Sequence, residues 1–185
     1  RAFSSEAAAI EARRCLDCDD LCSLCVTVCP NRANHAYPMP AMPLELPVLT
    51  ARAGKLVAEG KTTVAIAQEI QIVNVADFCN ECGNCTTFCP TAGAPYRDKP
   101  RVWLDAEGYA EAKGDAFRFE REDGILTIEA RLAGKPHRLE RRTYVTEYTS
   151  ETVVARFETG SSEWLDGEAI GSPAEGQTVD LAPCA

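Results

Sequence analysis

The chain has 185 residues, a hydrophobic fraction of 45%, a formal net charge of −9 at pH 7 and a sequence pI near 4.8. This length allows one domain or two small ones, and the acidity argues against nucleic acid as a partner. No stretch reaches the 18 or more apolar residues of a membrane helix, so we expect no membrane association. Ten cysteines without a secretory signal favour a reducing compartment, and we expect a cytoplasmic location.

The first predicted element is a short helix near the start of the chain. Ser4 or Ser5 can cap its first turn, because a serine hydroxyl accepts a hydrogen bond from a free backbone N–H group there. The helix would then run to Arg14 and lead directly into the first cysteine, Cys15.

Five cysteines crowd the next segment, residues 15–30, which ends in a cysteine–proline pair. The run has the pattern C-x2-C-x3-C-x2-C-x3-C-P, formed by Cys15, Cys18, Cys22, Cys25, Cys29 and Pro30. Asp17, Asp19 and Asp20 lie among these cysteines. Their negative charge would disfavour the addition of an electron to a redox centre, unless they simply form a solvated acidic loop.

An insertion, residues 31–77, separates this run from a second one. Its first part, residues 37–47, contains too many prolines for a helix or a central strand, so we expect an extended segment on the surface. β-Branched residues then predict strands at 62–66 and 70–75, and the second of these leads into Cys79.

The second cysteine run is the most informative motif of the chain. It reads C-x2-C-x2-C-x3-C-P and consists of Cys79, Cys82, Cys85, Cys89 and Pro90. This is the ligand run of bacterial ferredoxins, in which the fourth cysteine binds the other cluster of a two-cluster protein. Two such runs in one chain predict two [4Fe–4S] clusters and a function in electron transfer.

The exchange of the fourth cysteine assigns the ligands. One cluster would be bound by Cys18, Cys22, Cys25 and Cys89, and the other by Cys79, Cys82, Cys85 and Cys29. Because each cluster takes ligands from both runs, cluster assembly would also join the two segments. An alternative in which Cys15 is a ligand and Cys18 or Cys22 is spare stays open. Cys184 lies outside both runs and is expected to be a free thiol.

Other uses of cysteine fit the spacing less well. A disulfide framework would scatter its cysteines along the chain. Zinc also binds C-x2-C pairs, yet zinc sites rarely need four cysteines within eleven residues followed by proline. A structural scaffold domain, with zinc or with redox-silent iron–sulfur, is therefore the alternative function.

Alternation of apolar and polar residues replaces cysteine after Pro100. The turn signal Asp123-Gly124 predicts a hairpin within this region. The expected strands cover residues 117–121, 126–132, 137–140, 144–148 and 153–157. No catalytic constellation is evident, and His35 and His137 are expected to be ordinary loop and strand residues.

These elements predict an α+β fold. Residues 1–100 would form a two-cluster ferredoxin-like domain that carries the insertion, and residues 101–160 a small antiparallel β-unit. Residues 161–185, rich in Gly, Ser, Glu and Pro, would form a loosely ordered tail.

The residues around both cysteine runs also resemble a more specific family. The resemblance lies in Glu11-Ala12-x-Arg14-Cys15-Leu16-x-Cys18, Cys29-Pro30-Asn31-Arg32-Ala33-Asn34, Phe78-Cys79-Asn80-Glu81-Cys82-Gly83-Asn84-Cys85, Phe88-Cys89-Pro90 and Gly93-x-Pro95-Tyr96-Arg97-Asp98-Lys99. Over about residues 5–105 the chain resembles the carboxy-terminal iron–sulfur region of the family named as selenate reductase subunits. These are flavin oxidoreductases similar to the glutamate synthase small subunit. The insertion is longer than expected for that family, and the β-unit resembles its tail only in kind.

The resemblance implies that the chain is the electron-exit end of an NADPH-dependent oxidoreductase complex. FAD and NADPH would be bound by a preceding domain or a partner, and not by this chain. Single electrons would leave through the two clusters to a redox protein partner, for which a molybdenum enzyme is a candidate. The chain by itself would then catalyse no reaction on a substrate.

Overall fold

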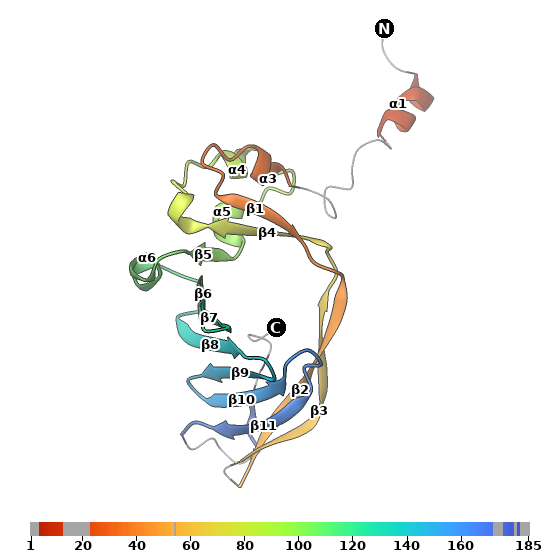
Figure 1. Cartoon of the computed structure of the whole chain (residues 1–185). Coiled ribbons are helices and arrows are strands. Elements are labelled where there is room, and N and C mark those ends of the chain that lie inside the picture. Colours follow the sequence, from red (N-terminus) through yellow and green to blue (C-terminus); the bar gives the residue numbers. More distant parts are fainter. Residues whose placement is uncertain (1–3, 13–22, 54, 172–175, 180, 182–185) are drawn as a thin grey trace. The chain divides into compact units, whose positions relative to one another are not determined.

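The computed structural model describes residues 4–12, 23–53, 55–171, 176–179 and 181. The chain divides into two compact units (Figure 1). The first unit comprises residues 1–40 and 68–99, and the second comprises residues 41–67 and 100–185. Residues 41–67 thus belong with the β-strands of the second unit, although the sequence places them within the insertion.

The first unit consists of short helices and one antiparallel pair of strands. Its elements are α1 (Ser5–Ala12), α3 (Leu24–Thr27), β1 (Asn34–Pro38), β4 (Ile70–Val75), η1 (Ala76–Phe78), α4 (Asn84–Thr87) and α5 (Pro95–Asp98). The amide of Ala7 donates to the Ser4 hydroxyl over 3.2 Å, which confirms the predicted cap of the first helix. β1 pairs with β4 from Asn34 opposite Asn74 to Pro38 opposite Ile70.

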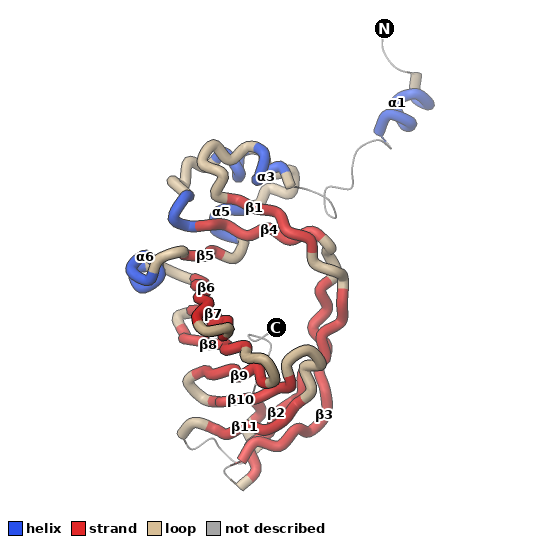
Figure 2. The backbone as a smooth tube through the Cα atoms, viewed as in Figure 1, coloured by secondary structure: helices blue, strands red, loops and turns tan. Residues whose placement is uncertain are grey.

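The second unit is built almost entirely from strands (Figure 2). Its elements are β2 (Met42–Arg52), β3 (Lys55–Ile66), β5 (Arg101–Trp103), α6 (Ala106–Glu111), β6 (Ala116–Glu122), β7 (Ile125–Leu132), β8 (Lys135–Arg141), β9 (Val145–Ser150), β10 (Val153–Glu158), β11 (Trp164–Ala169) and β12 (Thr178–Val179). β6 to β11 follow one another as an antiparallel meander, and β11 pairs in turn with β3.

The turn at Asp123-Gly124 confirms the predicted hairpin, and the turn at Ala133-Gly134 has the same geometry. Asp123 and Gly124 have φ values of 49° and 80°, and Ala133 and Gly134 have values of 50° and 79°. Positive φ at both central residues is the geometry of a type I′ turn, whose twist matches that of the flanking strands. The strands expected between residues 117 and 157 are all present, with boundaries that differ by a few residues.

The proline-rich segment, predicted to be extended chain and not a helix or a central strand, is extended but forms part of the paired strand β2. Pro43 and Pro47 both lie within β2, opposite Ala65 and Lys61 of β3. On its other side, β2 pairs with β12 only at Leu49 and Thr50. The prolines therefore occupy a part of β2 that is paired on one side only, where proline is tolerated better than in a central strand.

The core of the second unit lies between the β2–β3 hairpin and strands β9 and β10. Its buried residues are Leu46, Leu49, Ala51, Leu56, Tyr148, Val153, Ala155, Phe157 and Leu181. Trp164 packs against this core with its ring at 74° to that of Phe157 and the centroids 5.9 Å apart. Trp164 belongs to β11, within the segment that sequence composition assigns to a tail. Its aromatic burial explains why this segment joins the sheet.

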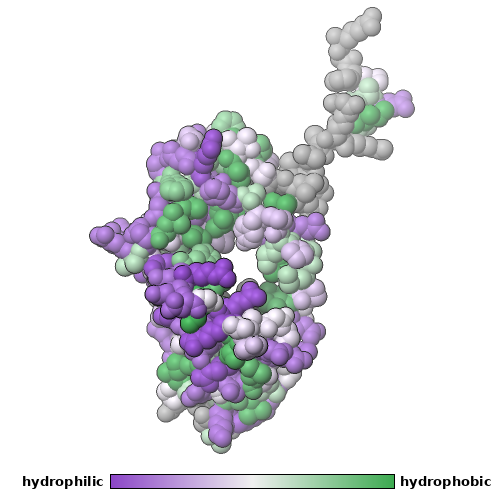
Figure 3. All heavy atoms as spheres, viewed as in Figure 1, coloured by the Kyte–Doolittle hydropathy of each residue, from purple (hydrophilic) through white to green (hydrophobic). Residues whose placement is uncertain are grey.

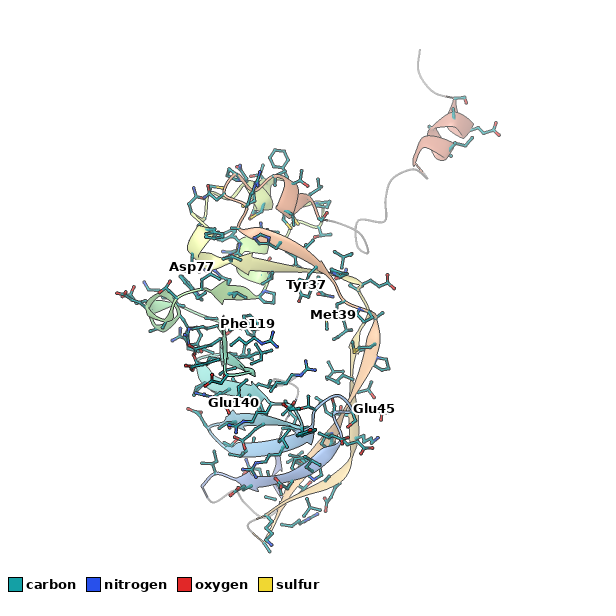
Figure 4. The ribbon with its side chains drawn as sticks, in the orientation of Figure 1. Tyr37, Met39, Glu45, Asp77, Phe119 and Glu140 are labelled. Carbon is teal, nitrogen blue, oxygen red and sulfur yellow. The ribbon has the colours of Figure 1, made fainter. Side chains whose placement is uncertain are left out.

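In Figure 3, hydrophilic residues gather over β6 to β8 of the meander. Several of them form ion pairs. Arg118 pairs with Glu129 at 3.0 Å, across β6 and β7. Glu140, labelled in Figure 4, accepts from both Arg138 and Arg142 at 2.6 Å, and these bonds lower the pKa of its carboxyl group. Arg118, Glu129 and Glu140 are half-buried in these pairs, whereas Arg138 and Arg142 are exposed to solvent.

The predicted α+β class is wrong. Strands predominate among the described elements of the chain, and none of the described helices exceeds eight residues. Two features account for the error. The insertion supplies the long strands β2 and β3, and the segments that follow cysteines 22 and 82 contain helices of only four residues.

Candidate functional site

From the short helices α3 and α4 onward, the two cysteine runs have similar local conformations, 60 residues apart. Each contains a four-residue helix, α3 or α4, followed by a turn that begins at the last cysteine of the run. We call residues 29–33 and 89–93 the cysteine–proline turns. In these turns Arg32 and Ala92 have φ values of 54° and 56°. Their amides donate to the carbonyls of Cys29 and Cys89, each over 3.2 Å.

Each cysteine–proline turn directs a backbone amide at its own sulfur. The amide of Ala33 donates to Cys29 Sγ over 3.2 Å, and that of Gly93 donates to Cys89 Sγ over the same distance. Hydrogen bonds of this kind favour the thiolate form, which is the form that binds metal.

Four cysteines line one pocket in the first unit. Three of them, Cys79, Cys82 and Cys85, come from the second run, and the fourth is Cys29 from the first run. The remaining lining residues are Asn34, Asn80, Glu81, Gly83, Asn84 and Tyr96. These four cysteines are the set that the exchange of fourth ligands assigns to one cluster.

The loop between Cys79 and Cys85 has a backbone that suits glycine at one position. β4 leads into η1, whose Asp77 is labelled in Figure 4, and Cys79 follows η1 directly. Gly83 then precedes α4 with φ at 80°, a left-handed conformation that glycine adopts readily. No atom lies within 4 Å of a Cβ built at Gly83, so backbone conformation, and not space, requires glycine there.

A buried amide pair joins β1, which follows the first cysteine run, to β4, which precedes the second run. Asn74 Nδ2 donates to Asn34 Oδ1 over 2.8 Å, and Asn34 Nδ2 donates to the carbonyl of Cys25 over 3.0 Å. Asn34 and Asn74 are 2% and 0% exposed. Beside them, Ile72 packs against the buried Cys25 and Cys85. Sequence reasoning did not identify this pair, although Asn34 lies within the segment that carries the family resemblance.

Cys89 shares a further hydrogen bond with Thr91, which sequence reasoning also missed. Thr91 Oγ1 lies 3.3 Å from Cys89 Sγ. This bond is the main cause that lowers the pKa of the Cys89 thiol, and the amides of Thr91 and Gly93 act in the same direction. Partial burial and the carboxylate of Asp98 oppose the shift.

Only some of the predicted ligands lie among the residues that the structure describes. Cys25 and Cys89 belong to the described residues, whereas Cys15, Cys18, Cys22 and Cys184 lie outside them. Among the described residues, no group of three or more His, Cys, Asp or Glu side chains is placed to hold a single metal ion. The ligand set of the second predicted cluster and the choice between Cys15 and Cys18 therefore stay predictions.

The second unit contains a separate pocket of about 610 Å³. It is lined by the β7–β8 and β9–β10 turns, together with Ile170 and residues 177–179. In its wall, His137 Nδ1 lies 2.7 Å from the hydroxyl of the buried Tyr148. Burial lowers the pKa of His137, so its neutral form is favoured. This strand histidine is thus half-buried and hydrogen-bonded.

Comparison with known proteins relates the chain to an oxidoreductase. The chain is 35% identical over 110 residues to the protein named "Putative oxidoreductase YgfK" from Escherichia coli strain K12, and equally to that from Escherichia coli O157:H7. The match covers 60% of this chain and spans about 8% of the length of either relative. No family model and no solved structure matches the chain.

Helix length bears on membrane insertion. In the described part of the chain, no helix is both long and apolar enough to cross a membrane.

Proposed function

We propose that this chain is an electron-transfer module that carries two [4Fe–4S] clusters. The observation that supports this proposal most is the pocket lined by Cys79, Cys82, Cys85 and Cys29. Three thiols from one run and a fourth from another run are the donor set of a two-cluster ferredoxin centre.

The donor set suits a four-iron cube better than a single ion. In a cube each thiolate binds a different iron, so the four sulfurs surround the cofactor without converging on one point. A zinc ion would require all four sulfurs at about 2.3 Å from the same centre. The bound cube would supply reversible uptake of one electron, and the chain would supply ligands and the surroundings that tune them.

The residues around the pocket would hold the thiolates in place and restrict water. The amide of Ala33 would stabilise the Cys29 thiolate through its hydrogen bond to Sγ. Ile72 and Tyr96 would cover the buried side of Cys85 with apolar surface. Hydrogen bonds to ligand sulfurs and the degree of burial are two of the means by which a protein sets a cluster's potential.

A second centre is proposed at Cys18, Cys22, Cys25 and Cys89. A shift of 60 residues aligns the last three cysteines of the first run with those of the second run. It aligns Cys79 with Asp19, which is the neighbour of Cys18, so one additional residue separates this ligand from the regular pattern. The matching conformations of the two cysteine–proline turns support equivalent functions for Cys29 and Cys89.

The donor and the acceptor are proposed from the resemblance and the sequence match. The relatives are many times longer than this chain, and oxidoreductase chemistry in such a protein would need further domains. We propose that FAD and NADPH bind to a preceding domain or a partner, and that electrons pass through the clusters to a redox protein. A molybdenum enzyme is one candidate for that acceptor.

Anaerobic purification followed by assay of iron and acid-labile sulfide tests the proposal. Two [4Fe–4S] clusters require about eight of each per chain, and dithionite should reduce each cluster by one electron. Zinc without sulfide would contradict electron transfer and favour a structural scaffold. About four irons would contradict the second centre alone.

Serine variants test the exchange of ligands. Cys29→Ser and Cys82→Ser should each reduce the iron content. The double variant should lose no more iron than the single variant with the larger loss, because both residues bind one cluster. A combination of Cys29→Ser with Cys89→Ser should affect both clusters. Cys184→Ser is the matched control and should retain full iron content. Additive losses in Cys29→Ser/Cys82→Ser would contradict the assignment.

A further inference from the structure

The two cysteine–proline turns differ at one position that faces a ligand sulfur. In the second turn, Thr91 Oγ1 lies 3.3 Å from Cys89 Sγ. The corresponding residue of the first turn is Asn31, and in the described residues Cys29 Sγ accepts its hydrogen bond from the amide of Ala33. The backbone on both sides is otherwise matched, including the amide-to-sulfur distance of 3.2 Å.

We propose that Thr91 raises the reduction potential of the iron–sulfur centre to which Cys89 contributes. The difference between Thr91 and the corresponding Asn31 would then help to set the difference in reduction potential between the two centres. This inference rests on the proposed function, since it requires that Cys89 is a cluster ligand. It assigns Thr91 as a positioning residue that acts through the sulfur of Cys89.

The sign follows from the direction of the hydrogen bond. A ligating cysteine has lost its proton, so its sulfur can only accept, and the Thr91 hydroxyl must donate. Donation withdraws electron density from the sulfur and stabilises the more negative state of the centre. When one electron enters from an external reductant such as dithionite, that state is the reduced one. No ligand bond breaks and no proton has to move.

The carboxylate of Asp98, near Cys89, has the opposite effect on the reduction potential. Asp98 is a carboxylate, and its negative charge disfavours added electrons. Its Oδ2 already accepts a hydrogen bond from the amide of Ala94 over 2.5 Å, which disperses part of that charge. Asp98 is present in every variant of Thr91, so its effect does not enter the comparison between these variants. Removal of the hydroxyl should therefore lower the potential.

The experiment compares isosteric and conservative variants of the anaerobically purified chain. Thr91→Val removes the hydroxyl with little change in volume, Thr91→Ser retains it, and Asn31→Thr introduces it into the first turn. Thr87→Val is the matched control, because the Thr87 hydroxyl donates to the Gly83 carbonyl over 3.2 Å and to no sulfur. Both midpoint potentials are measured by a redox titration followed by electron paramagnetic resonance.

We expect Thr91→Val to lower one of the two potentials by about 30 mV, a change of about threefold in the reduction equilibrium of a one-electron couple. Thr91→Ser and Thr87→Val should leave both potentials unchanged, and Asn31→Thr should raise the other potential. The inference is overturned if Thr91→Val moves neither potential, if Thr87→Val has the same effect, or if Asn31→Thr has none.

The same samples separate this inference from the proposed function. Iron and sulfide contents are measured on each variant before the titration. If the unmodified chain holds no cluster, both the proposed function and the inference fail. If clusters are present and the potentials do not respond to Thr91→Val, only the inference fails.

Discussion

The buried amide pair Asn34–Asn74 offers a test of what holds the first unit together. Asn34→Ala removes the acceptor of Asn74 Nδ2 and the donor to the Cys25 carbonyl, which are two hydrogen bonds of 2.8 and 3.0 Å. A buried polar group that loses its partner costs about 1–3 kcal/mol. Asn34→Ala should therefore lower the stability of the first unit by about 2–6 kcal/mol, because two such groups are affected.

Asn74→Ala should have a smaller effect. It removes one hydrogen bond, and it also removes Asn74 Oδ1, a buried acceptor without a hydrogen-bond partner in the described residues. We expect a loss of about 1–3 kcal/mol from the unpaired Asn34 Oδ1, partly offset by the removal of that acceptor. The double variant should be less destabilised than the sum of the single variants, because the two side chains share one bond.

Native-state hydrogen exchange is the appropriate assay, since a chain of two units need not unfold in one step. The amides of β1 and β4 should be least protected from exchange in Asn34→Ala, better protected in Asn74→Ala and best protected in the unmodified chain. All samples are compared at equal metal content. His35→Ala is the matched control on β1, where the side chain is exposed, and should change stability by less than about 0.5 kcal/mol. An equal effect of both asparagine variants, or full additivity, would refute the reasoning.

Two further predictions concern Gly83 and His137. Gly83→Ala places a Cβ at a residue whose φ is 80°, which should cost about 1–2 kcal/mol of stability. The strained loop should shorten the lifetime of the proposed cluster in air, measured by the decay of its visible absorbance. An unchanged lifetime would contradict this reasoning. Because burial lowers the pKa of His137, the folded second unit should lose stability as the pH falls below about 6.5, where the unfolded histidine gains its proton first. His137→Gln should remove this part of the pH dependence in urea unfolding between pH 7.5 and 5.5, and an unchanged slope would show that other groups cause it.

Local sequence signals predicted local structure well. Ser4 caps α1, Asp123-Gly124 forms the hairpin turn between β6 and β7, and the β-branched residues 70–75 form β4. Each of these features depends on residues close together in the chain, where side-chain capping, positive φ and strand propensity act without distant partners. The two cysteine runs are a local signal of the same kind, and the iron–sulfur ligation that their spacing predicts stays a proposal.

Pairing between segments that lie far apart in the chain could not be predicted from the sequence. Pro43 and Pro47 disfavour a strand locally, yet β2 forms because β3 satisfies its one paired side and Leu46 and Leu49 enter the core. Trp164 lies in a segment of tail-like composition, yet its ring packs against Phe157. The Asn34–Asn74 bond joins residues that are 40 positions apart.

The sequence by itself therefore determined the turns, the individual strands of the meander and the cysteine motifs. Only the tertiary structure decided the mostly β character of the fold, the partners of β2 and β11, and the meeting of Cys29 with residues 79–85 around one pocket. The physical reason is that burial and strand pairing depend on which segments meet in space, and these contributions override local preference wherever the two conflict.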